Sequence, residues 1–217
     1  VALMRATTDA NRHFYYKPRL DLQKLAGWAA GHWIVFSGHP GSDMANAVFG
    51  DAYRRAYRST TYEEARSYVR HDWKTALPAL ACRFRDLFGK ENFFLEVQLV
   101  DQANMPAALV VALLMRWVGK KTGIPCLATP DAHYARSPDA VDQRVTLCSP
   151  LGATLQDVER RALTNEDVSM GGFFRSKRYH VPSPEDLLAM GEPHTQEELT
   201  NAIRAAEMCG GYDLGGT

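Results

Sequence analysis

Asp131 and His133 are the residues whose types and spacing most directly suggest chemistry, and they stand in Ala-Thr-Pro-Asp-Ala-His-Tyr over 128–134. They follow an apolar segment, 124–129, whose composition is typical of a buried strand. In extended backbone the side-chain period is two, so both side chains point to the same side and can reach one cation. Mixed carboxylate and imidazole ligation favours zinc, manganese or iron over calcium. The pair therefore predicts part of a metal centre.

A third candidate ligand, His39, follows another strand-like run in Ser-Gly-His-Pro over 37–40, where glycine allows the chain to turn. In parallel α/β folds the catalytic groups gather at the carboxyl ends of the strands, so His39 is expected at the same rim as Asp131 and His133. An alternative stays open, because Asp-x-His also occurs by chance and a lone loop histidine is often only polar surface.

Glu96 lies between the apolar residues of a second strand-like run, 93–99. A buried carboxylate is costly unless it is paired or metal-bound, so Glu96 could be an additional site residue at the rim. A strand glutamate that faces solvent or a helix lysine is an equally good interpretation. The remaining histidines have no partner at ligand spacing and are predicted to be exposed or capping residues: His13, His32, His71, His180 and His194.

Lys17 and Arg19, in Phe-Tyr-Tyr-Lys-Pro-Arg over 14–19, could clamp a phosphate. Arginine offers a planar fork of donors and lysine a point charge. The competing interpretation is a solvated basic turn. The sequence contains neither Gly-x-x-x-x-Gly-Lys nor Gly-x-Gly-x-x-Gly, so the usual nucleotide cradles are absent.

Three segments must position these residues, and each is rich in β-branched, aromatic or aliphatic side chains bounded by turn formers: 34–37, 93–99 and 124–129. Helical spacing fills the intervals between them. This strand and helix alternation predicts parallel strands in an α/β fold.

The first helical interval should begin at the capping residue Thr61 and run to Gly89, with a kink or split at Pro78. In the second interval, Asn104 is predicted to cap a helix that has Pro106 in its first turn.

Beyond residue 135 the pattern changes to mostly helical. The segment 140–148 is expected to be a helix, 154–167 is mixed and polar, and 171–174 has the composition of a turn and edge segment. Ser183 and Thr195 each begin a helix with capping-box chemistry.

The bulk composition is that of an ordinary globular protein, with 46% hydrophobic residues, 23% charged residues and a formal net charge of zero over 217 residues. A single domain is expected over 1–217. The neutral balance gives no general support for nucleic-acid binding, which would need a local basic patch. No apolar run is long enough to span a bilayer, and the four cysteines lack a Cys-x-x-Cys pair, so a reducing cytoplasm is the simplest setting.

The chain resembles the PHP (polymerase and histidinol phosphatase) domain of the bacterial DNA polymerase III alpha subunit, specifically the C-terminal part of that domain. The resemblance spans nearly the whole sequence. The stretches that carry it occur in family order at 14–19, 34–38, 92–98, 123–134, 179–186 and 205–209.

This resemblance implies a partial distorted (β/α)7 barrel over 1–135, followed by a C-terminal part over 136–217 that leads toward the polymerase palm. It implies that Asp131 and His133 match the last metal-ligand motif of the family, and that His39 replaces a cysteine that is usual at that position. The implied cofactor is a divalent metal, zinc or manganese, and the implied reaction is metal-assisted phosphodiester hydrolysis of the 3′–5′ exonuclease type.

One departure from the family affects these expectations. The family opens with a His-x-His ligand motif, and no His-x-His occurs in this sequence. The chain is therefore expected to be a piece of a longer polymerase, with weak metal affinity and little hydrolysis of its own. A half barrel would also leave a strand edge that a partner or a terminal segment must cover.

Three functional hypotheses remain from the sequence. The chain is part of a polymerase whose PHP domain hydrolyses DNA ends, or it is a scaffold that stabilises the polymerase and docks a proofreading exonuclease subunit. The third hypothesis is a stand-alone PHP phosphoesterase. The partners implied by the first two are DNA, through the parent polymerase, and the remaining polymerase segments.

Overall fold

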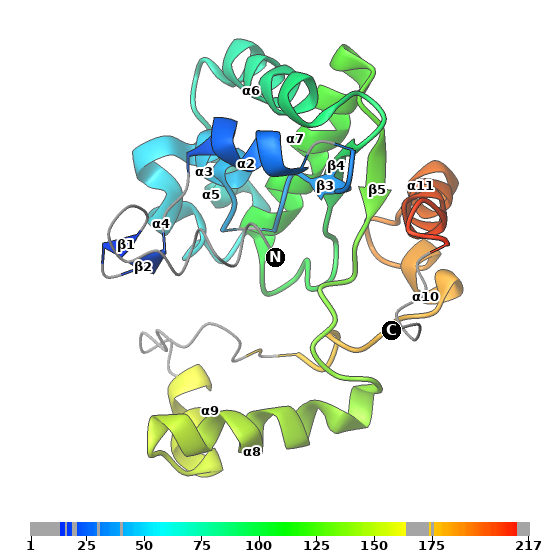
Figure 1. Cartoon of the computed structure of the whole chain (residues 1–217). Helices are drawn as coiled ribbons and strands as arrows, with labels where there is room; N and C mark the ends of the chain where they lie inside the picture. Colours follow the sequence, from blue (N-terminus) through cyan, green and yellow to red (C-terminus); the bar gives the residue numbers. More distant parts are fainter. Residues whose placement is uncertain are drawn as a thin grey trace.

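The computed structural model describes residues 14–15, 17–18, 21–29, 31–39, 41–163, 174 and 176–211. The described elements are a short antiparallel pair, a parallel sheet and helices around it (Figure 1). In chain order they are β1 (Phe14–Tyr15), β2 (Lys17–Pro18), α2 (Leu22–Ala29), β3 (Val35–Phe36), α3 (Asp43–Phe49), η1 (Gly50–Ala52), α4 (Tyr53–Ala56), α5 (Tyr62–Ser67), α6 (Trp73–Phe88), β4 (Phe93–Val97), α7 (Pro106–Thr122), β5 (Cys126–Ala128), η2 (Ser137–Asp139), α8 (Ala140–Leu151), α9 (Leu155–Leu163), α10 (Pro184–Leu188) and α11 (Gln196–Glu207).

The parallel sheet has the strand order β3-β4-β5, and its three strands lie within the three segments predicted from sequence. Val35 pairs with Phe93, and Leu95 pairs with Cys126, both in parallel register. Each strand is shorter than its apolar run, although backbone hydrogen bonds from Ser37 to Phe94 and from Thr129 to Val97 continue the ladder past the strand ends. The parallel sheet with its helices is compatible with the predicted α/β class. The described strands form a three-stranded sheet, and the partial (β/α)7 barrel stays a prediction.

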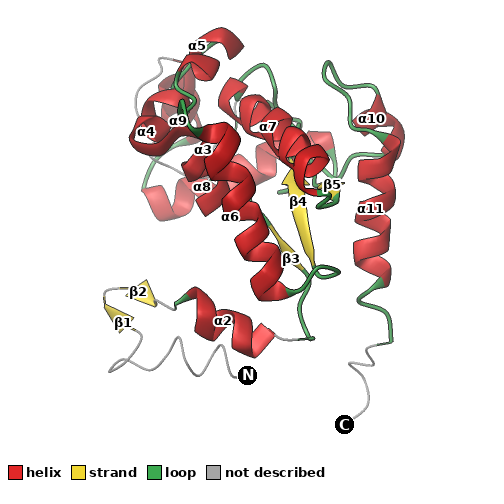
Figure 2. Cartoon of the chain, turned by 90° about the horizontal axis from the view of Figure 1, so that it is seen from above, coloured by secondary structure: helices red, strands yellow, loops and turns green. Residues whose placement is uncertain are grey.

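Helices cover both faces of this sheet. Phe93 and Leu95 point into a core formed with α3, α6 and α7, whereas Phe94 and Leu127 point the other way. On that second face they pack against α11 through Ala205. Figure 2 shows the sheet lying between α6 and α7 on one side and α11 on the other. The alternation of Phe93, Phe94 and Leu95 follows the two-residue period of a strand and fills both layers.

The outer edge of β5 is covered by α11, as expected of a strand edge that needs protection. The backbone amide of Leu95 donates to the carbonyl of Pro125, and the amide of Thr129 donates to the carbonyl of Val97. Because successive carbonyls in a strand point to opposite sides, the Cys126 carbonyl points away from β4. The side-chain amide of Asn201 donates a hydrogen bond to that carbonyl at 2.7 Å. Helix α11 therefore supplies a hydrogen bond to the Cys126 carbonyl that a further strand would otherwise supply.

The helical run predicted from Thr61 to Gly89 is divided, but not at Pro78; of the predicted kink or split at this proline, the split was wrong. Thr61 caps α5, which ends at Ser67, and Pro78 lies inside α6. The break comes where the backbone amide of Arg70 leaves the helix to donate to the carbonyl of Val48 at 3.0 Å. A long-range backbone contact thus sets this boundary, and proline is tolerated near the start of the next helix.

The predicted cap of α7 was wrong by one residue. Met105 is the N-cap residue and Pro106 occupies the first turn, as expected of proline. The side chain of Asn104 instead donates to the carboxylate of Asp101 at 2.9 Å, within the turn that precedes the helix. At the other end Gly123 adopts φ 72°, a left-handed conformation that glycine allows without steric cost.

Gly119 is the residue of α7 that allows this helix to approach β5 closely. A Cβ atom at this position would lie 2.6 Å from Cys126 Sγ and 3.0 Å from the backbone oxygen of Ile124. We expect Gly119→Ala to lower the free energy of unfolding by roughly 1–2 kcal/mol, because overpacking outweighs the gain in helix propensity of about 1 kcal/mol. Urea denaturation followed by circular dichroism measures this change.

Gly27 in α2 provides the matched control, because a Cβ atom there would meet nothing within 4 Å. We expect Gly27→Ala to leave stability unchanged or to raise it by up to about 1 kcal/mol. If both substitutions stabilise the protein equally, close packing of α7 on β5 is not a constraint.

The C-terminal part is mostly helical, as predicted, and its capping boxes are confirmed. The Ser183 side chain caps α10 and the Thr195 side chain caps α11, each with a reciprocal acid three residues on. The predicted helix 140–148 extends to Leu151 as α8. Helices α8 and α9 lie side by side and stand apart from the helices around the sheet (Figure 1). Of the segment predicted as a turn, 171–174, only Phe174 lies within the described residues.

Candidate functional site

Polar residues from all three parallel strands meet at the carboxyl ends of β3, β4 and β5. Ser37 follows β3, is buried, and its hydroxyl accepts a hydrogen bond from the backbone amide of Glu96 at 2.8 Å. The Glu96 carboxylate accepts a hydrogen bond from the hydroxyl of Thr129, just past β5, at 2.6 Å. At the rim where the sequence predicts a site, Ser37, Glu96 and Thr129 are thus linked by hydrogen bonds.

Asp131 lies two residues beyond this group, in a strained backbone conformation. Among the residues that the structure describes, it is the one non-glycine residue with a positive φ, at 47°. Such a conformation costs on the order of 1 kcal/mol, and it persists where the surrounding contacts hold it, often at ligand sites. Its side chain is 34% exposed, so the carboxylate is open to a ligand.

His133 is held against an aromatic wall formed by Phe174 and Tyr179. Its ring centroid lies 4.6 Å from that of Phe174 and 6.0 Å from that of Tyr179, and both contacts are edge-on. Its backbone amide donates to the carbonyl of Tyr179 at 2.7 Å. Burial raises the pKa of the Tyr179 hydroxyl, and the nearby carboxylates of Asp101 and Asp131 raise it further, so this wall stays neutral.

The ring of His133 has one nitrogen engaged and one available. Its Nδ1 lies 2.7 Å from the backbone oxygen of Asp131, and a carbonyl can only accept, so Nδ1 carries the hydrogen in this bond. The lone pair is then on Nε2. A backbone carbonyl that fixes the tautomer in this way is the usual partner of a metal-binding histidine. His133 is therefore prepared to act as a ligand through Nε2.

His39 is exposed and its ring makes a different local contact. Its Nδ1 accepts a hydrogen bond from the backbone amide of Gly41 at 2.9 Å. In the neutral ring the hydrogen is then on Nε2, and ligation through that atom requires the other tautomer. The structure thus places His39 at the loop after β3, as predicted, but in a form that is not prepared for a metal.

The described residues bring Asp131 and His133 together but do not complete a metal site. The carboxylate of Asp131 lies 3.9 Å from Nδ1 of His133. Within the part of the chain that the structure describes, no group of three or more His, Cys, Asp or Glu residues is placed to hold one ion. Zinc requires three or four protein ligands. Two side chains are fewer than such a site needs, so the described residues alone do not form one.

Glu96 is half-buried, and the side-chain partners of its carboxylate in the described structure are not helix lysines. Thr129 and the side-chain amide of Gln98 both donate to the same carboxylate oxygen, Oε1. Lys17 lies in β2, where only its backbone is described, and Arg19 lies outside the described residues. The predicted phosphate clamp therefore stays a prediction.

Sequence reasoning missed Thr129 and Asp101. Asp101 is 5% exposed and accepts a hydrogen bond from the hydroxyl of Ser176 at 2.8 Å, which ties the segment carrying Tyr179 to the end of β4. Their position was the available signal, because Thr129 ends the predicted run 124–129 and Asp101 lies two residues beyond the run 93–99, and polar residues at strand ends lie near the rim.

The prediction that His194 is an exposed or capping residue was wrong. His194 is 2% exposed, and its Nδ1 lies 3.0 Å from the Glu198 carboxylate. Arg116 of α7 binds the other oxygen of Glu198 through Nε at 2.6 Å. Burial raises the pKa of Glu198, but hydrogen bonds from His194, Arg116 and the backbone amide of Thr195 lower it more, to about 2. This buried ionic cluster joins α11 to α7, away from the predicted ligands in sequence.

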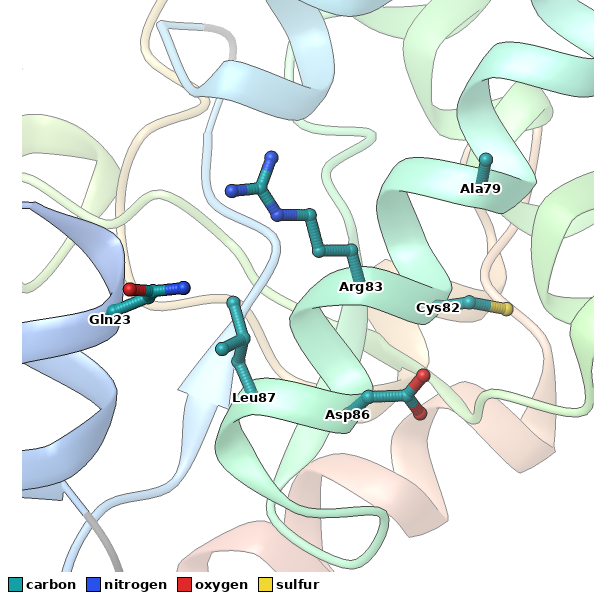
Figure 3. Close-up of a pocket in the computed structure, with 6 residues that line it drawn as sticks. All are labelled: Gln23, Ala79, Cys82, Arg83, Asp86 and Leu87. Atoms are coloured by element: carbon teal, nitrogen blue, oxygen red, sulfur yellow. The ribbon is translucent and has the colours of Figure 1, made fainter.

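A shallow pocket of about 440 Å³ lies between α2 and α6. Figure 3 shows Gln23 entering it from α2 and the other lining residues from α6, namely Ala79, Cys82, Arg83, Asp86 and Leu87. None of the predicted ligands lines this pocket, so it is separate from the Asp131 and His133 pair.

The chain is similar over most of its length to a class of bacterial proteins with one common name, DNA polymerase III subunit alpha. The protein of Treponema pallidum (strain Nichols) is 29% identical over 197 residues, which cover 90% of this chain and 14% of that protein. The protein of Saccharopolyspora erythraea is 30% identical over 199 residues, covering 92% and 14%. The protein of Thermus aquaticus is 28% identical over 199 residues, covering 90% and 13%. The chain thus corresponds to about one seventh of the length of these relatives.

No family model matches the chain. Among the residues described by the structure, no helix is both long and apolar enough to cross a membrane.

Proposed function

We propose that this chain is a segment of a bacterial DNA polymerase III alpha subunit and forms the C-terminal part of its PHP domain. The observation that carries this proposal is the similarity to alpha subunits of several bacteria over about 90% of the chain. The same coverage favours a polymerase segment over a stand-alone PHP phosphoesterase. On this proposal the parent acts in DNA replication in the cytoplasm, and its partners are DNA and the other polymerase segments.

The site function that the geometry supports best is a share in a divalent metal centre of the phosphoesterase type. Asp131 and His133 would hold the metal, and His39 would add a third ligand after a change of tautomer. A bound zinc or manganese ion would polarise a phosphate and lower the pKa of a bound water. The observation that supports this role is the His133 ring, whose Nδ1 is held by a backbone carbonyl, which leaves the lone pair of the neutral ring on Nε2. The remaining ligands would come from other segments of the parent.

We expect Asp131→Asn in the full-length parent to weaken zinc or manganese binding about tenfold or more, because an anionic ligand becomes a neutral amide. Metal content after dialysis and titration with Mn²⁺ measure this loss. Asp142→Asn serves as the matched control, because Asp142 is an exposed aspartate on α8.

Two results would contradict the metal proposal. One is a full-length parent without stoichiometric metal, and the other is an Asp131→Asn variant that binds metal as the control does. Either result leaves the proposed relation to the polymerase intact, because that relation rests on the sequence similarity.

A second candidate function is a non-catalytic scaffold that docks a proofreading exonuclease subunit. The observation that favours it is α8, where Val141 and Val145 lie one turn apart and are 41% and 53% exposed. Exposed apolar side chains on a helix that stands apart from the body can bind a protein partner. A metal-free parent that still binds the exonuclease, and loses it on Val145→Asp substitution, would favour this candidate.

A further inference from the structure

The Glu96 carboxylate is the point where side chains from two strands converge on one atom. Its Oε1 accepts a hydrogen bond from Thr129 Oγ1 at 2.6 Å and another from Gln98 Nε2 at 2.9 Å. Bonds to an ionised acceptor are shorter and stronger than neutral ones. The distance to Thr129 is at the short end of the range for a hydroxyl donor.

The parallel register explains why these residues meet. Glu96 pairs with Leu127 across the ladder, and Thr129 lies two residues further along, on the same face as Leu127. Gln98 stands on that face of the β4 segment as well, two residues after Glu96. A glutamate side chain is long enough to reach forward to both donors. From its position within β4, Glu96 thus accepts a hydrogen bond from Thr129 at the end of the β5 segment.

Thr129 is the anchor of the loop that carries the candidate ligands. Its backbone amide donates to the carbonyl of Val97 at 3.2 Å, and only Pro130 separates it from Asp131. Because the ring of Pro130 fixes its φ, the chain between Thr129 and Asp131 has one fewer rotatable backbone bond, and the position of Thr129 restricts that of Asp131. The far end of the loop is held by the bond from the His133 amide to Tyr179. The strained φ of Asp131 persists because both ends are fixed.

We propose that Glu96 is a positioning residue that holds Thr129 and thereby fixes Asp131 and His133 in place. This inference rests on the proposed function for the identity of the two ligands. In this role Glu96 acts through Oε1, which accepts both hydrogen bonds. The bond to Thr129 holds the loop, and the bond to Gln98 only orients the carboxylate.

Hydrogen exchange of the metal-free chain tests this role, with the amides of Thr129 and His133 as reporters. We expect Thr129→Val, which removes the donor at nearly constant shape, and Glu96→Ala to speed exchange of both amides about tenfold. Glu96→Gln keeps an accepting oxygen and should stay within about threefold of wild type. Gln98→Ala is the matched control, because it removes the other bond to Oε1 and should leave the loop unchanged. Amides in the centre of α7 should exchange as in wild type in every variant.

Unchanged exchange at His133 in Thr129→Val would overturn the proposal, and so would equal effects of Gln98→Ala and Thr129→Val. If Glu96→Ala does not fold, the comparison of Thr129→Val with Gln98→Ala decides alone. Titration of the full-length parent with Mn²⁺ is the second arm, and there Thr129→Val should weaken binding about tenfold while Gln98→Ala does not. A parent that binds no Mn²⁺ would refute the metal proposal, whereas the exchange result still decides whether Glu96 holds the loop.

Discussion

Replacement of Glu198 by alanine is expected to lower the free energy of unfolding by roughly 3–5 kcal/mol. The Glu198 side chain is 3% exposed, and it binds Arg116 at 2.6 Å and His194 at 3.0 Å. Without the carboxylate, the Arg116 guanidinium, which is 15% exposed, keeps only Glu192 and a carbonyl as partners. The substitution also removes the acid of the Thr195 capping box. Urea denaturation at neutral pH measures the loss.

Glu197 provides the matched control on the same turn of α11. It is exposed, and both Glu197 and Glu198 lie in the first turn, so either alanine substitution removes the same favourable charge from the helix N-terminus. Only Glu198 is part of the buried cluster. We expect a small loss for Glu197→Ala, and equal losses for the two variants would show that the cluster contributes nothing beyond helix capping.

The same carboxylate gives this prediction a pH signature. The folded pKa of Glu198 is about 2, below its ordinary value of 4.5. A carboxyl whose pKa is depressed by folding stabilises the protein fully above the unfolded pKa and loses this contribution as pH falls toward the folded pKa. The difference in unfolding free energy between wild type and Glu198→Gln should therefore shrink from about pH 4.5 to pH 2. A difference that stays constant over this range would show that Glu198 is not the titrating group.

Local sequence patterns were enough to predict the elements of the sheet. The runs at 34–37, 93–99 and 124–129 each contain their strand. Short runs of β-branched and aromatic residues between turn formers pack well on a pleated sheet surface, so the local pattern is enough to predict a strand. The capping boxes at Ser183 and Thr195 are also correct, since a side chain that binds an amide three residues on is a local interaction.

Features that depend on long-range contacts were not predictable from these patterns. The boundary between α5 and α6 follows from a backbone bond between Arg70 and Val48, not from Pro78. His194 contacts Glu198, and the same carboxylate binds Arg116, which is 82 residues away from it in sequence. Neither pairing leaves a periodic or spacing signal, so a buried histidine was taken for a surface one.

In the candidate site, too, the features set by local sequence were predictable and those set by long-range contacts were not. Asp131 and His133 could be found because their pairing is local and lies at a strand end. The contact of Thr129 with Glu96 depends on the parallel register of β4 and β5, which places Thr129 two residues beyond Leu127, the partner of Glu96. The expected third ligand, His39, depends on loop geometry after β3, and its ring binds Gly41 instead. Register and loop conformation therefore decide which polar residues at a rim act together.

We expect Phe94→Ala to lower the free energy of unfolding by roughly 3–5 kcal/mol and to release α11 from the sheet. The Phe94 side chain is fully buried, and with Leu127 it forms the surface on which Ala205 of α11 packs. Loss of the ring leaves a cavity under α11, whose apolar side chains at this contact are the small Ala202 and Ala205. It also removes the ring over which the Arg204 guanidinium lies, at 6.0 Å. Chemical denaturation measures the stability, and hydrogen exchange of the α11 amides reports detachment of the helix.

Phe36 is the matched control, because it is the same residue type on the neighbouring strand and its ring contacts that of Phe94 edge-on at 6.2 Å. It is 41% exposed, so Phe36→Ala should cost about 1 kcal/mol and leave exchange in α11 unchanged. Because Asn201 of α11 also covers the edge of β5, detachment of this helix would expose both a sheet face and a strand edge. If Phe94→Ala lowers the free energy of unfolding no more than Phe36→Ala does, α11 does not serve as the second layer over the sheet. The edge of β5 must then be protected in another way.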